Sequence, residues 1–178
     1  MTYPLIQAKH FTAGREGHAP RIIVLHTMET PETVGRAKQV ANWFAGSTAP
    51  QASAHYCVDP VDIIQSVKDE DTAWAVDDFG LNQQSISIEL AGSASQTSAQ
   101  WHDAYSTAEF NKLVSLSKAL SVKYGIPAKW LNTAMILDGK TKGFCTHHDI
   151  TIAKKIAGGH TDPGANFPMV AFLQAVEK

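Results

Sequence analysis

The amino-acid sequence predicts an α/β fold, because segments with strand periodicity alternate with segments with helix periodicity along the chain. Residues 21–25 form a short run that is β-branched and apolar on both faces, and residues 85–90 alternate between polar and aliphatic side chains. Residues 34–44 and 110–124 carry apolar side chains at the spacing of one helix face. Interleaved strands and helices of this kind predict a sheet covered by helices.

The predicted strand over residues 21–25 ends at His26. A run that is apolar on both faces is typical of a strand buried inside a parallel sheet. The carboxyl ends of such strands are where α/β proteins usually place their ligands. His26 is therefore a candidate site residue.

A helix and a hairpin are predicted next. Thr30 and Pro31 predict the N-cap and first turn of a helix that continues to Gly46. Two strand-like runs, residues 54–58 and 63–67, flank an Asp-Pro-Val-Asp turn sequence. This arrangement predicts a β-hairpin.

The strand over residues 85–90 places Ser85, Ser87 and Glu89 on one face and the aliphatic side chains on the other. Its alternation predicts a strand with a polar face. Residues 143–146 form another short strand-like segment, which leads into His147.

Two helices are predicted in the second half of the chain. Ser106 and Glu109 have the spacing of a capping box, and the apolar stripe that follows ends at Gly125. Pro168 starts a closing helix, since proline is favoured in a first turn.

Composition and charge exclude several classes of protein. The chain has 178 residues, of which 44% are hydrophobic and 18% charged, so we expect one globular domain over residues 1–178 with residues 1–20 as an N-terminal extension. A net charge of −2 provides no basic surface for nucleic acid or anionic membranes, and we expect neither partner. We expect a monomer.

The first 17 residues contain no basic cluster followed by an apolar run, and no stretch of about 18 apolar residues occurs. We therefore expect synthesis in the cytoplasm without a signal peptide. Two cysteines, Cys57 and Cys145, are too few to staple a secreted domain, and we expect both to be reduced.

Eight histidines make metal chemistry the first candidate. A hydrolytic zinc site needs three protein ligands and one open position, with the ligands at strand ends or on adjoining loops. His26, His147 and Asp162 fit this requirement. Taken singly, a histidine after a strand is more often a structural or a surface residue than a metal ligand.

Five motifs occur in the order seen in zinc N-acetylmuramoyl-L-alanine amidases, a family that resembles peptidoglycan recognition proteins in fold. They are Val24-Leu25-His26-Thr27, Ser53-Ala54-His55-Tyr56, Ser87-Ile88-Glu89-Leu90, Thr146-His147-His148-Asp149-Ile150 and His160-Thr161-Asp162-Pro163-Gly164. The resemblance covers residues 21–168. It implies a central mixed β-sheet flanked by helices, zinc bound by His26, His147 and Asp162, and hydrolysis of the amide bond between N-acetylmuramic acid and L-alanine in peptidoglycan.

Residues 8–12 and 26–32 look more narrowly like amidase domains of endolysins from phages of actinobacteria. This resemblance implies an enzyme that is made in the host cytoplasm and acts on the cell wall after release.

The resemblance also implies a role for Glu89. Zinc held by two neutral imidazoles and one carboxylate keeps a positive charge, lowers the pKa of its water and polarises the scissile carbonyl. Glu89 would take the proton from that water and pass it to the departing alanine nitrogen. Read without the resemblance, Glu89 is a solvent-facing carboxylate of a strand.

At His160 the sequence departs from many relatives, which carry lysine there. At neutral pH only a fraction of histidine side chains is protonated and offers a positive charge to the developing oxyanion. The remaining fraction offers a neutral N–H donor. We therefore predict a catalytic role for His160 and a stronger pH dependence than in a lysine enzyme. The alternative is that His160 replaces Asp162 as a zinc ligand.

Several neighbouring residues receive weaker assignments. His148 must face away from the metal if His147 faces it, and we expect Asp149 to cap a helix over residues 151–156 rather than to orient a ligand. Trp74 occupies a position where the family has a tryptophan beside the substrate groove. His55 is expected to be packed and hydrogen-bonded, and we include it with Trp74 as a candidate groove residue.

Two rival functions compete with the amidase. The first is a module that binds muropeptides without cleaving them, which an intact ligand set with Glu89 argues against. The second is a cysteine hydrolase that uses Cys145 with a nearby histidine, although the apolar neighbour Phe144 favours a buried, inert thiol.

Overall fold

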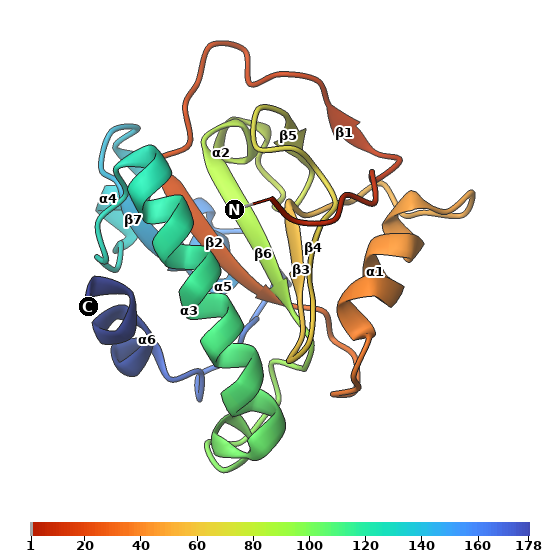
Figure 1. The fold of residues 1–178 in the computed structure, drawn as a ribbon. Helices are drawn as coiled ribbons and strands as arrows, with labels where there is room; N and C mark the ends of the chain where they lie inside the picture. Colours follow the sequence, from red (N-terminus) through yellow and green to blue (C-terminus); the bar gives the residue numbers. More distant parts are fainter. Residues whose placement is uncertain (1) are drawn as a thin grey trace.

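The structure, a computed structural model, describes residues 2–178 and contains a five-stranded mixed sheet (Figure 1). The strand order is β4-β3-β6-β2-β7, in which β4 is antiparallel to β3 and the other neighbours are parallel. The strands are β2 (Ile22–Thr27), β3 (Tyr56–Val58), β4 (Ile63–Gln65), β6 (Ser85–Leu90) and β7 (Gly143–Thr146). The predicted α/β class with a central mixed sheet is confirmed, and the predicted hairpin corresponds to β3 and β4.

Helices cover both faces of this sheet (Figure 1). The long helix α3 and the C-terminal helix α6 pack on one face, and the other helices cover the opposite face. Their bounds are α1 (Arg36–Ala45), α2 (Phe79–Gln83), α3 (Ala104–Tyr124), α4 (Thr133–Leu137), α5 (His147–Lys154) and α6 (Met169–Glu177), with a 3-10 turn at Gln100–His102. No helix within residues 2–178 has the length and hydropathy needed to cross a membrane.

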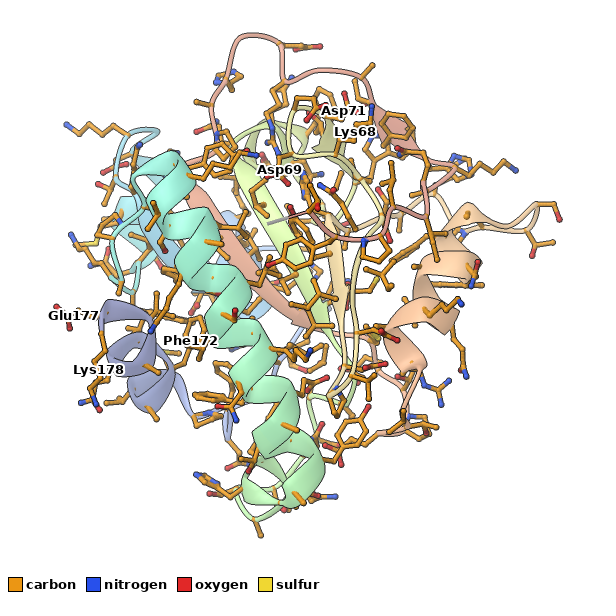
Figure 2. All side chains as sticks on the ribbon, viewed as in Figure 1. Lys68, Asp69, Asp71, Phe172, Glu177 and Lys178 are labelled. Carbon is orange, nitrogen blue, oxygen red and sulfur yellow. The ribbon has the colours of Figure 1, made fainter. Side chains whose placement is uncertain are left out.

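Side-chain alternation on the central strands divides the core into two layers. Ile23 and Leu25 of β2 pack towards α3 and α6, where Phe172 is fully buried (Figure 2). Ile22 and Val24 point to the opposite face, towards α4 and α5. Burial of each large aliphatic side chain stabilises the fold by about 1.5–3 kcal/mol. His26 has the same parity as Ile22 and Val24, so its side chain lies on the α5 side of the sheet.

The N-terminal segment packs onto the domain. Its short strand β1 (Phe11–Thr12) pairs with β5 (Thr72–Ala73), and the buried Arg15 donates hydrogen bonds to the carbonyls of Asp69, Gln83 and Ser85. The predicted N-terminal extension therefore contacts the sheet.

A second buried anchor lies at the C-terminal end of α3. The carboxylate of Asp69 (Figure 2) accepts hydrogen bonds from the Tyr56 hydroxyl, the Lys123 ammonium and the Tyr124 hydroxyl. These bonds fix the end of α3 against the hairpin.

The predicted start of the first helix, at Thr30 and Pro31, is wrong. Helix α1 begins at Arg36, because Gly35 has a φ of 83° and its left-handed conformation breaks a helix. Glu32, which would lie in the predicted first turn, instead accepts hydrogen bonds from Ser106 Oγ at 2.5 Å and Gln96 Nε2 at 3.1 Å.

The capping box predicted at Ser106 and Glu109 is also wrong. Helix α3 begins at Ala104, and its N-cap is Asp103, whose side chain accepts a hydrogen bond from Ser106 N–H. Glu109 is buried and accepts a hydrogen bond from Ala91 N–H at 2.7 Å. Its carboxylate therefore supports the loop after β6 rather than the helix start.

Glu109 makes the stability of the protein depend on pH. Burial raises its pKa from the ordinary 4.5 to about 9. The folded protein therefore holds a proton that the unfolded chain releases between these two values, so stability falls as pH rises from about 5 to 9. We expect Glu109→Gln to raise Tm at pH 8.5 by at least about 3 °C relative to the wild type and to have little effect at pH 5.

Scanning calorimetry at the two pH values checks this expectation. The exposed Glu70→Gln provides a control for loss of one acidic charge. An equal change in Tm at both pH values would show that Glu109 is ionised in the folded protein.

Candidate metal centre

Parallel pairing of β2 and β6 brings two predicted site residues together. His26 and Glu89 are register partners near the carboxyl ends of these strands, so both side chains project from the same face. The polar face predicted for residues 85–90 exists, but it is covered by protein. Ser85 and Ser87 are buried, and Glu89 is half-buried and lines a cavity.

His147 reaches the same place from the first turn of α5. Thr146 is the N-cap of this helix and forms a capping box with Asp149. Asp149 does cap a helix, but the helix starts at His147, not at the predicted residue 151. Asp149 Oδ2 also accepts a hydrogen bond from Trp130 Nε1, so the hydrogen bonds of this oxygen go to Trp130 and Thr146 and not to the histidines.

The loop that carries Asp162 is attached to the start of α5. His148 N–H donates to the Asp162 carbonyl at 3.1 Å, and the His148 ring is exposed, with Nδ1 3.0 Å from the His160 carbonyl. His148 is therefore exposed and outside the metal-ligand group, whereas its neighbour His147 is buried within it. Gly164 lies so close to the Ala94 carbonyl that a Cβ there would come within 2.0 Å of it, which fixes this loop against residues 93–96.

His26, His147 and Asp162 form a buried group whose ligand atoms all lie within 4.8 Å of one another. The two Nδ1 atoms are 3.1 Å apart, and each lies 3.4 Å from an oxygen of Asp162. Ligand atoms held about 2.0–2.1 Å from a zinc ion at tetrahedral angles lie about 3.3 Å from one another. His26 Nδ1 faces Asp162 Oδ2 and His147 Nδ1 faces Oδ1, so the two imidazoles and the carboxylate approach one another at distances close to those between the ligand atoms of a tetrahedral zinc ion.

The protonation states also suit a metal. Burial lowers the pKa of His26, which keeps its imidazole neutral. Burial alone would raise the pKa of Asp162, but its hydrogen bonds with His147 and His26 outweigh this effect and lower it. Metal ligands must be neutral imidazoles and ionised carboxylates. The donor set therefore fits zinc.

Glu89 stands beside this group with an unsatisfied carboxylate. Its Oε2 is shielded from solvent and has no hydrogen-bond partner within residues 2–178. Burial raises the pKa of Glu89 well above its ordinary value, and the charges of Asp162 and Glu29 raise it further. Such a carboxyl group can hold and release a proton at the site.

His160 lies at the edge of the metal-ligand group. Its ring stacks on that of His147 with centroids 3.8 Å apart, and its Nδ1 is 3.4 Å from Asp162 Oδ1. Its side chain is 53% exposed, whereas the His26, His147 and Asp162 side chains are at most 6% exposed. His160 therefore faces the solvent side of the centre, where a substrate would approach.

An open cavity of about 580 Å³ leads to these residues. Helix α1 contributes Arg36, Val40 and Trp43 to the lining, and Trp74 also lines the cavity. Trp74 is held in place because its Nε1 donates to Thr12 Oγ1 at 2.9 Å.

His55 lies outside the cavity lining. It is fully buried, and its Nδ1 accepts a hydrogen bond from Ser87 N–H. Burial, together with the charge of Arg15, lowers the pKa of His55 to about 3. This histidine supports the strand that carries Glu89.

Sequence reasoning missed Arg36 and Trp43 as cavity residues. Arg36 and Trp43 are seven residues apart, so they lie on the same helical face, with Val40 between them. This spacing is the signal that could have identified them. The Trp43 side chain remains half-exposed, which leaves its ring available for contact with a substrate.

Both cysteines are fully buried and unpaired. Burial raises the pKa of Cys57 and raises that of Cys145 well above the ordinary value of a thiol. A catalytic cysteine needs a lowered pKa and access to substrate. The geometry therefore argues against the cysteine-hydrolase alternative.

A buried metal-ligand group at the carboxyl ends of parallel strands, beside a half-buried carboxyl group and open to a cavity, is the arrangement that metal-dependent hydrolases use, here within a mixed α/β fold. The sequence assigns the chain to a particular family within this class. The chain belongs to the N-acetylmuramoyl-L-alanine amidase family, whose sequence model matches residues 16–165. Its activity is therefore that of an N-acetylmuramoyl-L-alanine amidase. No curated protein matches the sequence.

Solved structures share the fold along almost the whole chain. PlyL has 18% sequence identity and a TM-score of 0.62, and the match covers 100% of this chain and 98% of that chain. Staphylococcus aureus hydrolase AmiA in complex with its ligand has 18% identity and a TM-score of 0.68, with coverages of 99% and 83%. An AmpD derivative has 18% identity and a TM-score of 0.65, with coverages of 99% and 94%.

Proposed function

We propose that this amidase depends on zinc and hydrolyses the amide bond between N-acetylmuramic acid and L-alanine of peptidoglycan. The observation that carries the proposal is the buried group of His26, His147 and Asp162, in which the two Nδ1 atoms lie 3.1 Å apart and each lies 3.4 Å from a different oxygen of Asp162. These three residues would hold the ion. Bound zinc would supply a Lewis acid that polarises the scissile carbonyl and activates water.

Glu89 is the proposed general base and acid. Its unsatisfied Oε2 would accept a proton from the attacking water, and the raised pKa would let the same atom release that proton to the alanine nitrogen. The nitrogen must be protonated, because an amide nitrogen leaves poorly as an anion. One carboxyl group thus serves both halves of the reaction.

His160 is the proposed donor to the oxyanion that develops on the carbonyl oxygen. Its exposed ring is stacked on His147 at the solvent side of the centre. The backbone also fixes its position, since His160 N–H donates to Thr151 Oγ1 at 3.1 Å. An N–H aimed at the developing charge stabilises the transition state more than the ground state.

We further propose that the chain is the catalytic domain of a phage or prophage endolysin that acts on the wall of its host. This proposal is supported by similarity to the catalytic domain of XlyA, at 16% identity and a TM-score of 0.65, and to a mutant endolysin from Bacillus subtilis, at 14% and 0.63. Each match covers 99% of both chains.

Metal analysis combined with an amidase assay tests the proposal. Purified protein is expected to contain one zinc per chain and to release L-alanine amino termini from peptidoglycan. A chelator should abolish release and added zinc should restore it, whereas a thiol alkylator should have no effect because both cysteines are buried. A zinc-free protein that binds muropeptides without releasing amino termini would support the non-catalytic binding module instead.

A further inference from the structure

The charges that line the cavity are unevenly distributed. Glu29, Asp77, Glu89 and Asp162 contribute carboxylates, whereas Arg36 is the one lysine or arginine among the lining residues of the described chain. Two of these carboxylates belong to the proposed zinc centre, where the ion would balance their charge. Arg36 is on the α1 wall and has no part in that centre.

The positive charge of Arg36 is unpaired. Its guanidinium makes hydrogen bonds only to neutral groups within residues 2–178, from Nη1 to Gln39 Oε1 at 2.9 Å and from Nη2 to Thr33 Oγ1 at 3.3 Å. No carboxylate of the described chain lies within ion-pair distance of it. Its Nε is shielded from solvent and has no acceptor. A partly buried guanidinium without a counter-ion is a ready site for an anion.

We propose that Arg36 binds a free carboxylate of the stem peptide and so makes the enzyme prefer substrates in which this group is not amidated. The inference rests on the proposed function, because it places the scissile bond at His26, His147 and Asp162 and the peptide along the same cavity. A side carboxylate of a peptide can be present either as the free anion or as its neutral amide, and the two forms have nearly the same shape. A planar guanidinium distinguishes the two forms, since an amide is neutral and also presents N–H donors to it.

Two features of the wall support a peptide in this position. Val40 and the half-exposed Trp43 continue the same helical face beyond Arg36, and they provide apolar surface beside the charge. The part of the wall formed by Trp74 is held in place by the hydrogen bond from its Nε1 to Thr12 Oγ1. A peptide in contact with both parts of the wall would have its backbone confined while one carboxylate meets Arg36.

The test uses zinc-loaded protein and soluble muropeptides that differ only in amidation of the second residue, of the third residue, or of both. For one of these carboxylates, we expect wild-type kcat/KM to exceed that for the amide by about tenfold, mainly through KM, as expected for loss of a charged hydrogen bond. Arg36→Gln should bring this ratio close to one. Arg36→Lys should retain part of it, because charge remains without the planar fork.

Lys38→Gln is the matched control, because Lys38 is an exposed cation on the same helix and does not line the cavity. In this variant the ratio of kcat/KM for the carboxylate to kcat/KM for the amide should equal that of the wild type. An unchanged ratio in Arg36→Gln would overturn the inference, as would an equal loss on all substrates, which would indicate a structural role. If zinc-loaded wild type cleaves no muropeptide, the proposed function fails. In that case, calorimetry measures the affinity of wild type and of Arg36→Gln for the same muropeptides. This measurement tests the role of Arg36 without relying on cleavage.

Discussion

Replacing Asp162 by asparagine is expected to remove zinc from the protein and to reduce amidase turnover by at least about 1000-fold. Asp162 is the anionic member of the metal-ligand group, and it is only 5% exposed. The neutral amide that replaces it keeps the shape of the side chain but is a poor zinc ligand. Elemental analysis after dialysis measures metal content, and the release of L-alanine amino termini measures turnover.

Thermal unfolding provides a second measurement for Asp162→Asn. An ion that binds only the folded state stabilises it, so zinc should raise Tm of the wild type and leave Tm of the variant unchanged. Asp77→Asn is a suitable control, because Asp77 lines the same cavity without belonging to the ligand group, and this variant should retain zinc. Full zinc occupancy in Asp162→Asn would exclude Asp162 as a ligand.

His160→Ala belongs in the same series, since the sequence left open whether His160 replaces Asp162 at the metal. The exposed, stacked position of His160 predicts that this variant keeps its zinc and loses turnover. Loss of zinc from His160→Ala with retention in Asp162→Asn would reverse the two roles.

The sequence predicted the central strands well because their patterns reflect burial directly. Residues 21–25 are apolar on both faces, and β2 is indeed buried by helices on both sides of the sheet. Strict alternation over residues 85–90 likewise matches β6. The ends of helices were less predictable, because capping depends on tertiary contacts. Glu32 and Glu109 were predicted to lie in the first turns of helices. In the structure their carboxylates instead accept hydrogen bonds from Gln96 and Ala91, in the loop after β6.

The metal-ligand residues could be proposed from motifs, whereas the cavity walls could not. Arg36 and Trp43 lie on an amphipathic helix, and in a sequence such positions look like an ordinary solvated face. Only the folded structure shows that this face lines the same cavity as His26, His147 and Asp162. The proposed specificity therefore depends on residues whose role is set by packing, whereas the chemistry depends on residues that recognisable motifs carry.

Glu89→Gln is the second substitution with a large expected effect, and it separates catalysis from metal binding. Glu89 is not among the ligand atoms of the metal group, so the variant should bind one zinc per chain as the wild type does. Turnover should fall by about 1000-fold, because glutamine can neither accept the proton of the attacking water nor deliver one to the alanine nitrogen. Rates from the same muropeptide assay and elemental analysis of the same samples measure both properties.

Ser87→Ala is the matched control for Glu89→Gln, since Ser87 is buried on the same face of β6 and its Oγ has no hydrogen-bond partner in the described chain. It should retain both zinc and turnover. If Glu89→Gln keeps most of its turnover, proton transfer must pass through another group, and His160 is then the candidate at the centre. If Glu89→Gln loses zinc as well, Glu89 supports the metal site itself. Only zinc retention with loss of turnover agrees with a carboxyl group that moves protons beside the metal.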